Sequence, residues 1–124
     1  MGYEVLVVED SAAMRSFIAS TLEEIDGVTV TEAESGFEAL KELPRRNYDV
    51  IITDINMPDI NGLELIRFIR ENDRHKETPL IIVSTESSQR DRERGLALGA
   101  NAYLVKPFSP SALKEMVESY LKAK

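Results

Sequence analysis

The sequence predicts an α/β fold: a doubly wound, five-stranded parallel sheet with five flanking helices. Short runs of Val, Ile and Leu recur along the chain, which is typical of strands buried on both faces. The segments between these runs carry apolar residues at helical spacing. Because right-handed crossovers place helices on both faces of such a sheet, we expect the flavodoxin-like strand order 2-1-3-4-5.

Two strand–helix pairs open the chain. We expect a strand near 4–8 and a helix near 12–25, whose inward-facing side chains are Ala13, Phe17, Ile18, Leu22 and Ile25. The strand near 28–33 is less apolar and alternates, as expected of an edge strand. The helix from about 36 to 46 should end or bend at Pro44, and its inward-facing residues are Phe37, Leu40 and Leu43.

The third strand is expected near 49–53, and the turn Asn61-Gly62 leads into the third helix. The apolar stripe of that helix consists of Leu63, Ile66 and Ile69, widened by Leu65 and Phe68. A fourth strand follows Pro79.

The fourth helix, about 88–98, differs from the others because its first half carries no large apolar side chain. Its expected anchors are Leu96, Ala97 and Leu98, and Gly99 can end it. Few buried apolar contacts imply a low local opening energy, so this helix is a candidate for movement. The fifth strand is 102–105, and the fifth helix begins with Ser109 as N-cap and Pro110 at its first position.

Composition sets the class of protein. A chain of 124 residues without a break in composition predicts one domain, 1–124, and the absence of cysteine excludes disulfides and cysteine metal sites. The net charge of −7 argues against nucleic acid as a partner. No run approaches about 18 apolar residues and no signal pattern opens the chain, so we expect a cytoplasmic protein without a membrane partner.

The only histidine, His75, stands in a polar stretch and is expected in an exposed loop.

Four of the predicted strands end in polar residues. Glu9-Asp10 follow the first strand, Asp54 the third, Ser84 the fourth and Lys106 the fifth. Because parallel strands share one carboxyl edge, where open α/β folds bind ligands, we expect these side chains to converge.

The converging residue types suit phosphate and metal chemistry. Mg²⁺ takes oxygen ligands and is commonly held by one or two carboxylates. A carboxylate such as Asp54 can attack phosphorus, giving an aspartyl phosphate whose charge a metal and Lys106 would balance. Each residue alone has an ordinary alternative: Asp10 as a helix cap, Asp54 in an Asx turn, Lys106 as a solvated charge and Ser84 as a loop residue. Pro107 permits a cis bond that would turn the chain after the lysine.

Over essentially its whole length, the chain resembles the receiver domain of two-component response regulators. The matching segments are Val7–Ser11, Asp54–Gly62, Ser84 and Lys106–Phe108. The resemblance implies a five-stranded parallel sheet with five helices. It also implies that the chain accepts a phosphoryl group from a phosphohistidine on a sensor histidine kinase.

By position, Asp54 resembles the phosphoacceptor of this family. Glu9, Asp10, Asp54 and the backbone carbonyl of Asn56 match the Mg²⁺ ligands, with Mn²⁺ as a possible substitute. Many members have Asp where this chain has Glu9, so Glu9 is expected to reach the metal through water.

The same resemblance implies how a signal leaves the site. Lys106, Ser84 and Thr85 match residues that bind the phosphoryl group, and Ser84 with Tyr103 matches the switch pair, although many members have Thr in place of this Ser. Asn56 and Glu86 match positions that tune dephosphorylation. The expected outcome is a changed face of the fourth helix, fifth strand and fifth helix.

Within the family, the chain is closest to the single-domain chemotaxis regulators in its length, in ending with the fifth helix, and at Asn56 and Glu86. That implies a monomer that is not an enzyme beyond its own phosphorylation and dephosphorylation. Its expected partners are a kinase, an output protein such as the flagellar motor switch, and a phosphatase.

Three alternatives stay open. One is a phosphorelay intermediate, and another is a metal-dependent small-molecule phosphatase, which would need a cap domain or substrate pocket. A flavodoxin-like electron carrier would need a phosphate-binding loop where this chain has Glu9-Asp10, whose charges would repel the cofactor phosphate.

Overall fold

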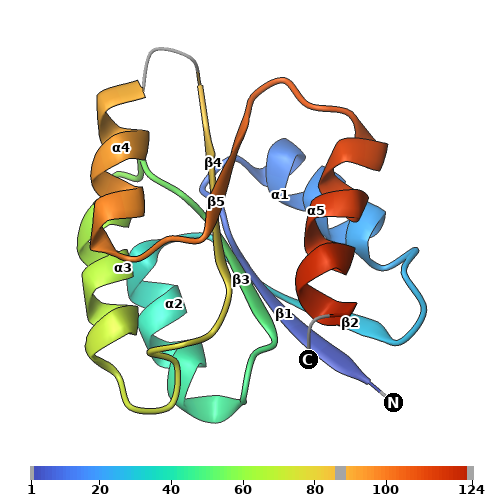
Figure 1. Cartoon of the computed structure of the whole chain (residues 1–124), viewed down its shortest axis with the longest axis horizontal. Coiled ribbons are helices and arrows are strands. Elements are labelled where there is room, and N and C mark those ends of the chain that lie inside the picture. The colour runs from blue at the N-terminus through green and yellow to red at the C-terminus, as the bar shows by residue number, and fades with distance from the viewer. Residues whose placement is uncertain (1, 86–88, 123–124) are drawn as a thin grey trace.

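Five parallel strands in the order β2-β1-β3-β4-β5 form the centre of the molecule, as predicted. The computed structural model describes residues 2–85 and 89–122. In chain order the elements are β1 (Tyr3–Val8), α1 (Ala12–Leu22), β2 (Val28–Ala33), α2 (Gly36–Glu42), the 3-10 helix η1 (Leu43–Arg45), β3 (Val50–Asp54), α3 (Gly62–Glu71), β4 (Leu80–Ser84), α4 (Gln89–Leu98), β5 (Ala102–Val105) and α5 (Pro110–Lys122). Helices α2, α3 and α4 cover one face of the sheet, and α1 and α5 cover the other (Figure 1).

Alternate residues of the central strands enter two separate cores. Towards α1 and α5 the strands contribute Val5, Val7, Val50, Ile52, Ile81 and Val83. Towards α2 and α3 they contribute Leu6, Val8, Ile51, Leu80 and Ile82. Because both faces are buried, the strands are apolar without interruption, which is why the sequence pattern identified them.

Side-chain caps fix where four of the helices begin. The helix-starting N–H groups of Met14, Glu38, Leu63 and Ala112 donate to the side chains of Ser11, Ser35, Asn61 and Ser109 respectively. Such caps satisfy amide groups that have no partner inside the helix. Ser109 as the cap of α5 is confirmed.

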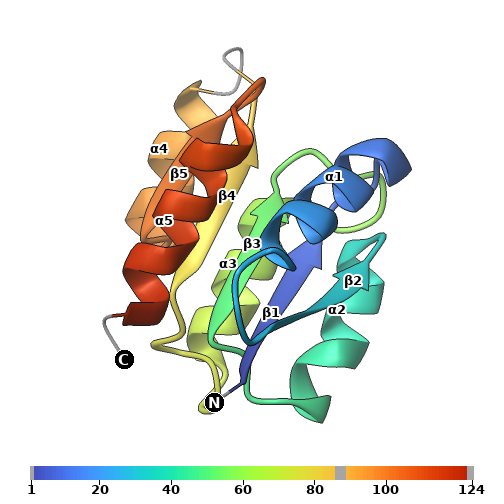
Figure 2. The same ribbon diagram turned by 90° about the vertical axis from the view of Figure 1, so that its right-hand side faces the viewer.

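The rim at the amino ends of the strands carries both ends of the described chain. Tyr3, where β1 begins, and Lys122, where α5 ends, line the same small hollow. Figure 2 shows that this rim lies at the opposite end of the sheet from the carboxyl ends of the strands. Among the described residues, no helix is long and apolar enough to span a membrane.

The predicted element bounds hold with two corrections. Helix α1 ends at Leu22 instead of residue 25, and α2 ends at Glu42. The chain then continues as a short 3-10 helix that contains Pro44. A bend at Pro44 is expected because proline has no amide hydrogen to continue an α-helical pattern.

The expectation that Ala13, Phe37 and Phe68 face inward was wrong. Ala13 is exposed, and Phe37 and Phe68 are 58% and 44% exposed. The buried positions of α2 are Gly36 and Ala39, and a Cβ at Gly36 would lie 2.6 Å from Ile60 Cβ. Because Gly36 has no side chain, α2 lies close to Ile60 on this side. The neighbouring Phe37 therefore points outward.

The predicted anchors of α4 were also partly wrong. Leu96 and Ala97 are exposed, whereas Leu98 packs partly against the core. The buried residues of α4 are Arg92 and Gly95. A Cβ at Gly95 would overlap the Ile82 side chain, so the absence of a side chain allows α4 to lie directly on β4. Gly99 follows the last residue of α4 with a φ of 121°, which favours glycine.

His75 is buried, with 1% exposure, contrary to the prediction of an exposed loop. Its Nε2 accepts a hydrogen bond from the Tyr48 N–H at 3.5 Å, and the two rings lie 5.8 Å apart. The charged neighbours of His75 are exposed while its ring points inward, so the polarity of the stretch was misleading. His75 precedes β4 and Tyr48 precedes β3, which places the pair at the amino edge of the sheet.

Candidate functional site

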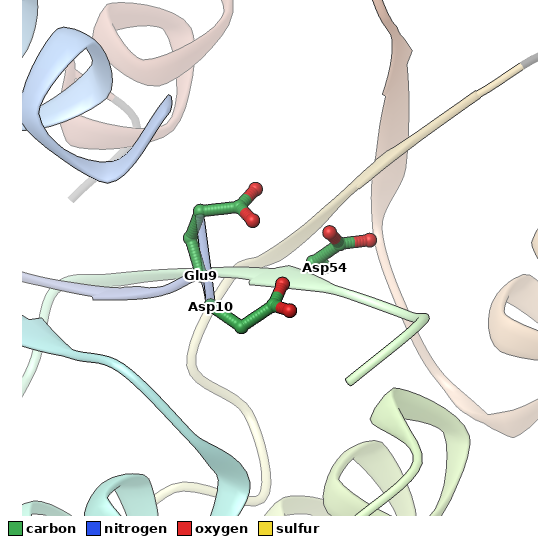
Figure 3. Close-up of side chains that lie close together, drawn as sticks. All are labelled: Glu9, Asp10 and Asp54. Atoms are coloured by element: carbon green, nitrogen blue, oxygen red, sulfur yellow. The ribbon is translucent and has the colours of Figure 1, made fainter. Parts of the chain in front are cut away.

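Three carboxylates meet at the carboxyl ends of two neighbouring strands. Glu9 and Asp10 follow β1, and Asp54 is the last residue of β3, with Val8 and Thr53 paired in register. One carboxylate oxygen from each residue lies within 4.8 Å of the others. Figure 3 shows the three side chains gathered around one space. The predicted convergence of these acids is therefore observed.

Glu9 is the most buried of the three acids, with 1% exposure. Its Oε2 accepts a hydrogen bond from the Ser11 N–H at 3.0 Å, and its Oε1 accepts one from the Lys106 ammonium at 2.9 Å. Burial raises the pKa of Glu9 because it disfavours the charged form, although both hydrogen bonds act in the opposite direction. Asp10 is exposed and faces solvent beside it.

The Lys106 ammonium bridges two of the carboxylates. It donates to Glu9 Oε1 at 2.9 Å and to Asp54 Oδ2 at 3.1 Å. Burial would lower the pKa of Lys106, but its hydrogen bonds and charge interactions with the two acids outweigh that effect and raise it. The Lys106–Pro107 peptide bond is cis, the conformation that the sequence permitted. Lys106 therefore carries its charge at the acidic cluster.

Asp54 ends β3, directly before a tightly held loop that leads to α3. Its Oδ1 accepts a hydrogen bond from the Asn56 N–H at 3.3 Å, and its side chain is 9% exposed. The loop closes where the Gly62 N–H donates to the Ile55 carbonyl at 2.8 Å. A Cβ at Gly62 would overlap the Asp54 carbonyl and lie 2.6 Å from Ile55 Cα, so only glycine fits there without movement.

A second contact ties this loop to α2. The Asp59 carboxylate accepts hydrogen bonds from the Gly36 N–H at 3.1 Å and the Phe37 N–H at 2.9 Å. These backbone hydrogen bonds lower the pKa of Asp59 to about 2. The sequence alone does not show this role, because nothing local in it connects Asp59 with a helix start more than twenty positions earlier.

Ser84 ends β4 with 1% exposure, and its Oγ has no hydrogen-bond partner among the described residues. Its carbonyl accepts a hydrogen bond from the Lys106 N–H at 2.7 Å, so β4 and β5 meet beside the acidic cluster. Buried hydroxyl groups are normally paired, and an exception calls for an explanation. Thr85 follows on the surface, and Glu86 lies outside the described residues.

Tyr103 on β5 is 41% exposed and points outward. The Arg92 guanidinium carbon lies 5.1 Å from its ring centroid. Arg92 Nη1 also donates to the Thr85 carbonyl at 2.6 Å. Arg92 is only 9% exposed, although nothing in the polar first half of this helix marks it as a buried residue.

Arg15 is another residue whose role the sequence alone does not show. Its Nη1 donates to the Glu9 carbonyl at 2.8 Å, and its Nε pairs with Glu32 at 3.3 Å. This contact braces the turn that carries Glu9 and Asp10. The spacing from Glu9 to Arg15 is short, but only the fold shows that the arginine turns back onto the strand end.

The donor set fits a hard divalent cation. All three side chains offer oxygen atoms, which Mg²⁺ prefers, and two of them already share one ammonium. Three clustered carboxylates with a single ammonium leave excess negative charge at the site, which a divalent cation would reduce.

The chain is similar in sequence to proteins of a known family. Residues 5–118 match the model of the response regulator receiver domain family. The chain is 43% identical to the chemotaxis protein CheY1 of Helicobacter pylori, covering 95% of this chain and 96% of that protein. It is also 43% identical to the CheY homologue of Campylobacter jejuni, over 95% and 92% of the two chains. CheY is a standard example of the strand order found here.

Solved structures of receiver proteins have the same fold as this chain. The Vibrio cholerae chemotaxis response regulator CheY4 superposes with a TM-score of 0.89 at 36% identity, covering 97% of this chain and 99% of that chain. The receiver domain of the sensor histidine kinase PA1611 from Pseudomonas aeruginosa has a TM-score of 0.89 at 31% identity, over 98% and 99% of the two chains. That structure has a magnesium ion coordinated in its active site cleft.

Proposed function

The chain belongs to the response regulator receiver domain family, and on that basis we propose that it accepts a phosphoryl group on Asp54 from a sensor histidine kinase and signals to an output protein. The observation that carries this proposal is the Lys106 ammonium bridging Glu9 and Asp54 beside Asp10. It places a fixed cation beside the carboxylate that would receive the phosphoryl group.

The transfer itself requires little from the protein beyond position and charge. An Asp54 carboxylate oxygen forms a bond to phosphorus, the bond from phosphorus to the imidazole nitrogen of the donor breaks, and its electron pair stays on that nitrogen. Lys106 is already within 3.1 Å of Asp54, so it can bond the incoming phosphoryl oxygens without a large movement. Ser84 and Thr85 would bind the same oxygens.

We propose Mg²⁺, with Mn²⁺ as a substitute, as the cation that the acidic cluster holds. Glu9, Asp10 and Asp54 would hold it, together with the backbone carbonyl of Asn56. When bound, such a cation supplies positive charge that reduces repulsion between these acids and the phosphoryl oxygens.

The signal would leave through Ser84 and Tyr103. The buried Ser84 hydroxyl, unpaired among the described residues, can donate to a phosphoryl oxygen, and its movement would carry Thr85 with it. Tyr103 points outward at rest and would turn inward, changing the face formed by α4, β5 and α5. Asn56 and Glu86 would tune the lifetime of the phosphoryl group.

The names of the similar proteins favour chemotaxis as the pathway, with the flagellar motor switch as the first candidate for the output protein. A phosphorelay intermediate is the second candidate. In either case we propose that the chain acts only on its own phosphoryl group and does not turn over small phosphate esters.

The test is the intact mass after incubation with acetyl phosphate, with and without Mg²⁺. We expect one phosphoryl adduct that needs Mg²⁺ on the natural chain and none on Asp54→Asn. Asp59→Asn is the matched control, because it removes a carboxylate from the same loop outside the acidic cluster, and it should still form the adduct. A Mg²⁺-dependent adduct on Asp54→Asn would remove Asp54 from its proposed role.

A second measurement separates the phosphatase alternative. Turnover of a generic phosphate ester beyond one equivalent per chain would support that alternative and contradict a receiver. We expect no release beyond one equivalent.

A further inference from the structure

Arg92 occupies an unusual place on α4. It is 9% exposed, whereas Arg90 and Arg94 on the same helix are exposed. Among the described residues outside its own helix, its guanidinium makes two contacts: a hydrogen bond from Nη1 to the Thr85 carbonyl at 2.6 Å, and a cation–π contact with Tyr103, 5.1 Å from the ring centroid. A planar guanidinium suits both contacts, because it donates in its plane and stacks through its face.

These two contacts join the parts that the proposed switch would move. Thr85 is bonded directly to Ser84, and Tyr103 lies on β5, which pairs with β4 so that Tyr103 faces Ile82 and Ser84 faces Val105. Figure 1 shows α4 lying along the side of the sheet where β4 and β5 run. Arg92 therefore connects α4 with both halves of the switch pair.

We infer that Arg92 is a positioning residue that holds the resting state: it keeps Tyr103 outward and holds the Thr85 carbonyl against its own guanidinium. This inference rests on the proposed function. When Ser84 moves towards a phosphoryl group on Asp54, the Thr85 carbonyl must move with it and strain the hydrogen bond to Arg92. When Tyr103 turns inward, its ring leaves the guanidinium. Both contacts favour the resting state and oppose the switched state.

The consequence is measurable because a ligand that binds only the switched state has an apparent affinity reduced by the fraction of molecules in that state. Beryllofluoride with Mg²⁺ is such a ligand, because it mimics a phosphoryl group on a carboxylate. Loss of one charge-assisted hydrogen bond and one cation–π contact should raise the switched fraction, and with it the apparent affinity, about tenfold.

The experiment follows Tyr103 by fluorine NMR on protein labelled with 3-fluorotyrosine, with the resonance assigned through Tyr103→Phe. Beryllofluoride is titrated in the presence of Mg²⁺ into the natural chain, Arg92→Met and Arg94→Met. Arg94→Met is the matched control, because it removes the same charge from an exposed position of the same helix. We expect the Arg92→Met midpoint to fall about tenfold and its Tyr103 resonance to lie closer to the switched position before any ligand is added. The Arg94→Met midpoint should equal that of the natural chain.

The outcomes separate this inference from the proposed function. If Tyr103 of the natural chain does not respond to saturating beryllofluoride, the proposed switch fails. If Tyr103 responds but the beryllofluoride midpoint of Arg92→Met equals that of the natural chain, the proposed role of Arg92 is wrong and the proposed switch is still supported.

Two further variants keep the inference testable if Arg92→Met does not fold. Arg92→Lys retains the charge and the stem but not the planar fork, so its midpoint should lie below that of the natural chain, and an unchanged midpoint would contradict the role of the planar guanidinium. In a Tyr103→Leu background, detected by the NMR signals of the residues around Asp54, the effect of Arg92→Lys on the midpoint should shrink. An undiminished effect there would show that Arg92 does not act through the ring.

Discussion

The Lys106 ammonium lies 3.1 Å from Asp54 Oδ2, although the two residues are 52 positions apart in the chain. The two residues meet because β3 and β5 are parallel strands of one sheet and expose their carboxyl ends at the same edge. The same ammonium bonds Glu9, so a single cation compensates two of the three clustered acids.

Removing this cation should cost stability. Lys106→Met leaves the Glu9 and Asp54 carboxylates facing each other without their shared ammonium, and we expect the free energy of unfolding to fall by about 1–3 kcal/mol in metal-free buffer. Urea unfolding measures the change. The control is Lys114→Met, which breaks the exposed ion pair with Glu24 and should change stability little. Equal losses in the two variants would mean that the Lys106 contacts contribute no more than a surface pair.

A bound divalent cation should stabilise the fold, because it binds the folded chain and not the unfolded one. At a Mg²⁺ concentration of 100 times its dissociation constant, the expected gain is about 2.7 kcal/mol, seen as a higher unfolding temperature. Asp10→Asn should lose most of this gain. Asp26→Asn, which removes an exposed acid outside the cluster, should keep it. An equal Mg²⁺ response in both variants would show that Asp10 does not contribute to cation binding.

Gly62→Ala should destabilise the chain even though alanine favours helices over glycine. The new Cβ would press on the backbone of Asp54 and Ile55, which cannot give way as a flexible side chain can. We expect a loss of about 1–3 kcal/mol and slower phosphoryl uptake, because the backbone at Asp54 and Ile55 must shift. Gly2→Ala is the control, since its Cβ would meet only the Gly27 carbonyl at 3.7 Å. If Gly62→Ala had the same free energy of unfolding as the natural chain, the close contact at Gly62 would be contradicted.

His75 gives a prediction for pH. Burial lowers its pKa below the ordinary value of 6.5, with the neighbouring Arg74 charge acting in the same direction. Below pH 6.5 the unfolded chain therefore binds more protons than the folded one, so stability should fall as the pH drops from 6.5 through the folded pKa. Urea unfolding at pH 7.5 and 5.5, compared with His75→Gln, isolates this contribution. Because the chain has one histidine, an NMR titration of its ring gives the folded pKa directly, and a value at or above 6.5 would refute the prediction.

Much of the fold and the meeting of the site residues could be predicted from the sequence. Continuous apolar runs such as Val50–Ile52 are required when both faces of a strand are covered, and parallel strands bring their carboxyl ends together. Glu9, Asp54 and Lys106 therefore meet as expected.

Other features depend on contacts that no local pattern encodes. Phe37 fits the apolar period of its helix, but the close approach at Gly36 decides which side of α2 packs inward. Arg92 and His75 are polar residues in polar segments, yet both are buried, and each contacts a tyrosine ring from another part of the chain, Tyr103 and Tyr48 respectively. Hydrophobic periodicity cannot identify a face that is defined by glycine or by a buried charge.

The shared position of Tyr3 and Lys122 at the amino rim has a practical consequence for single-molecule and surface-binding measurements. A fluorophore or an immobilising tether joined near either residue would stand at the far end of the molecule from Asp54. Binding partners could then approach the reactive edge of the sheet without steric interference from the attachment.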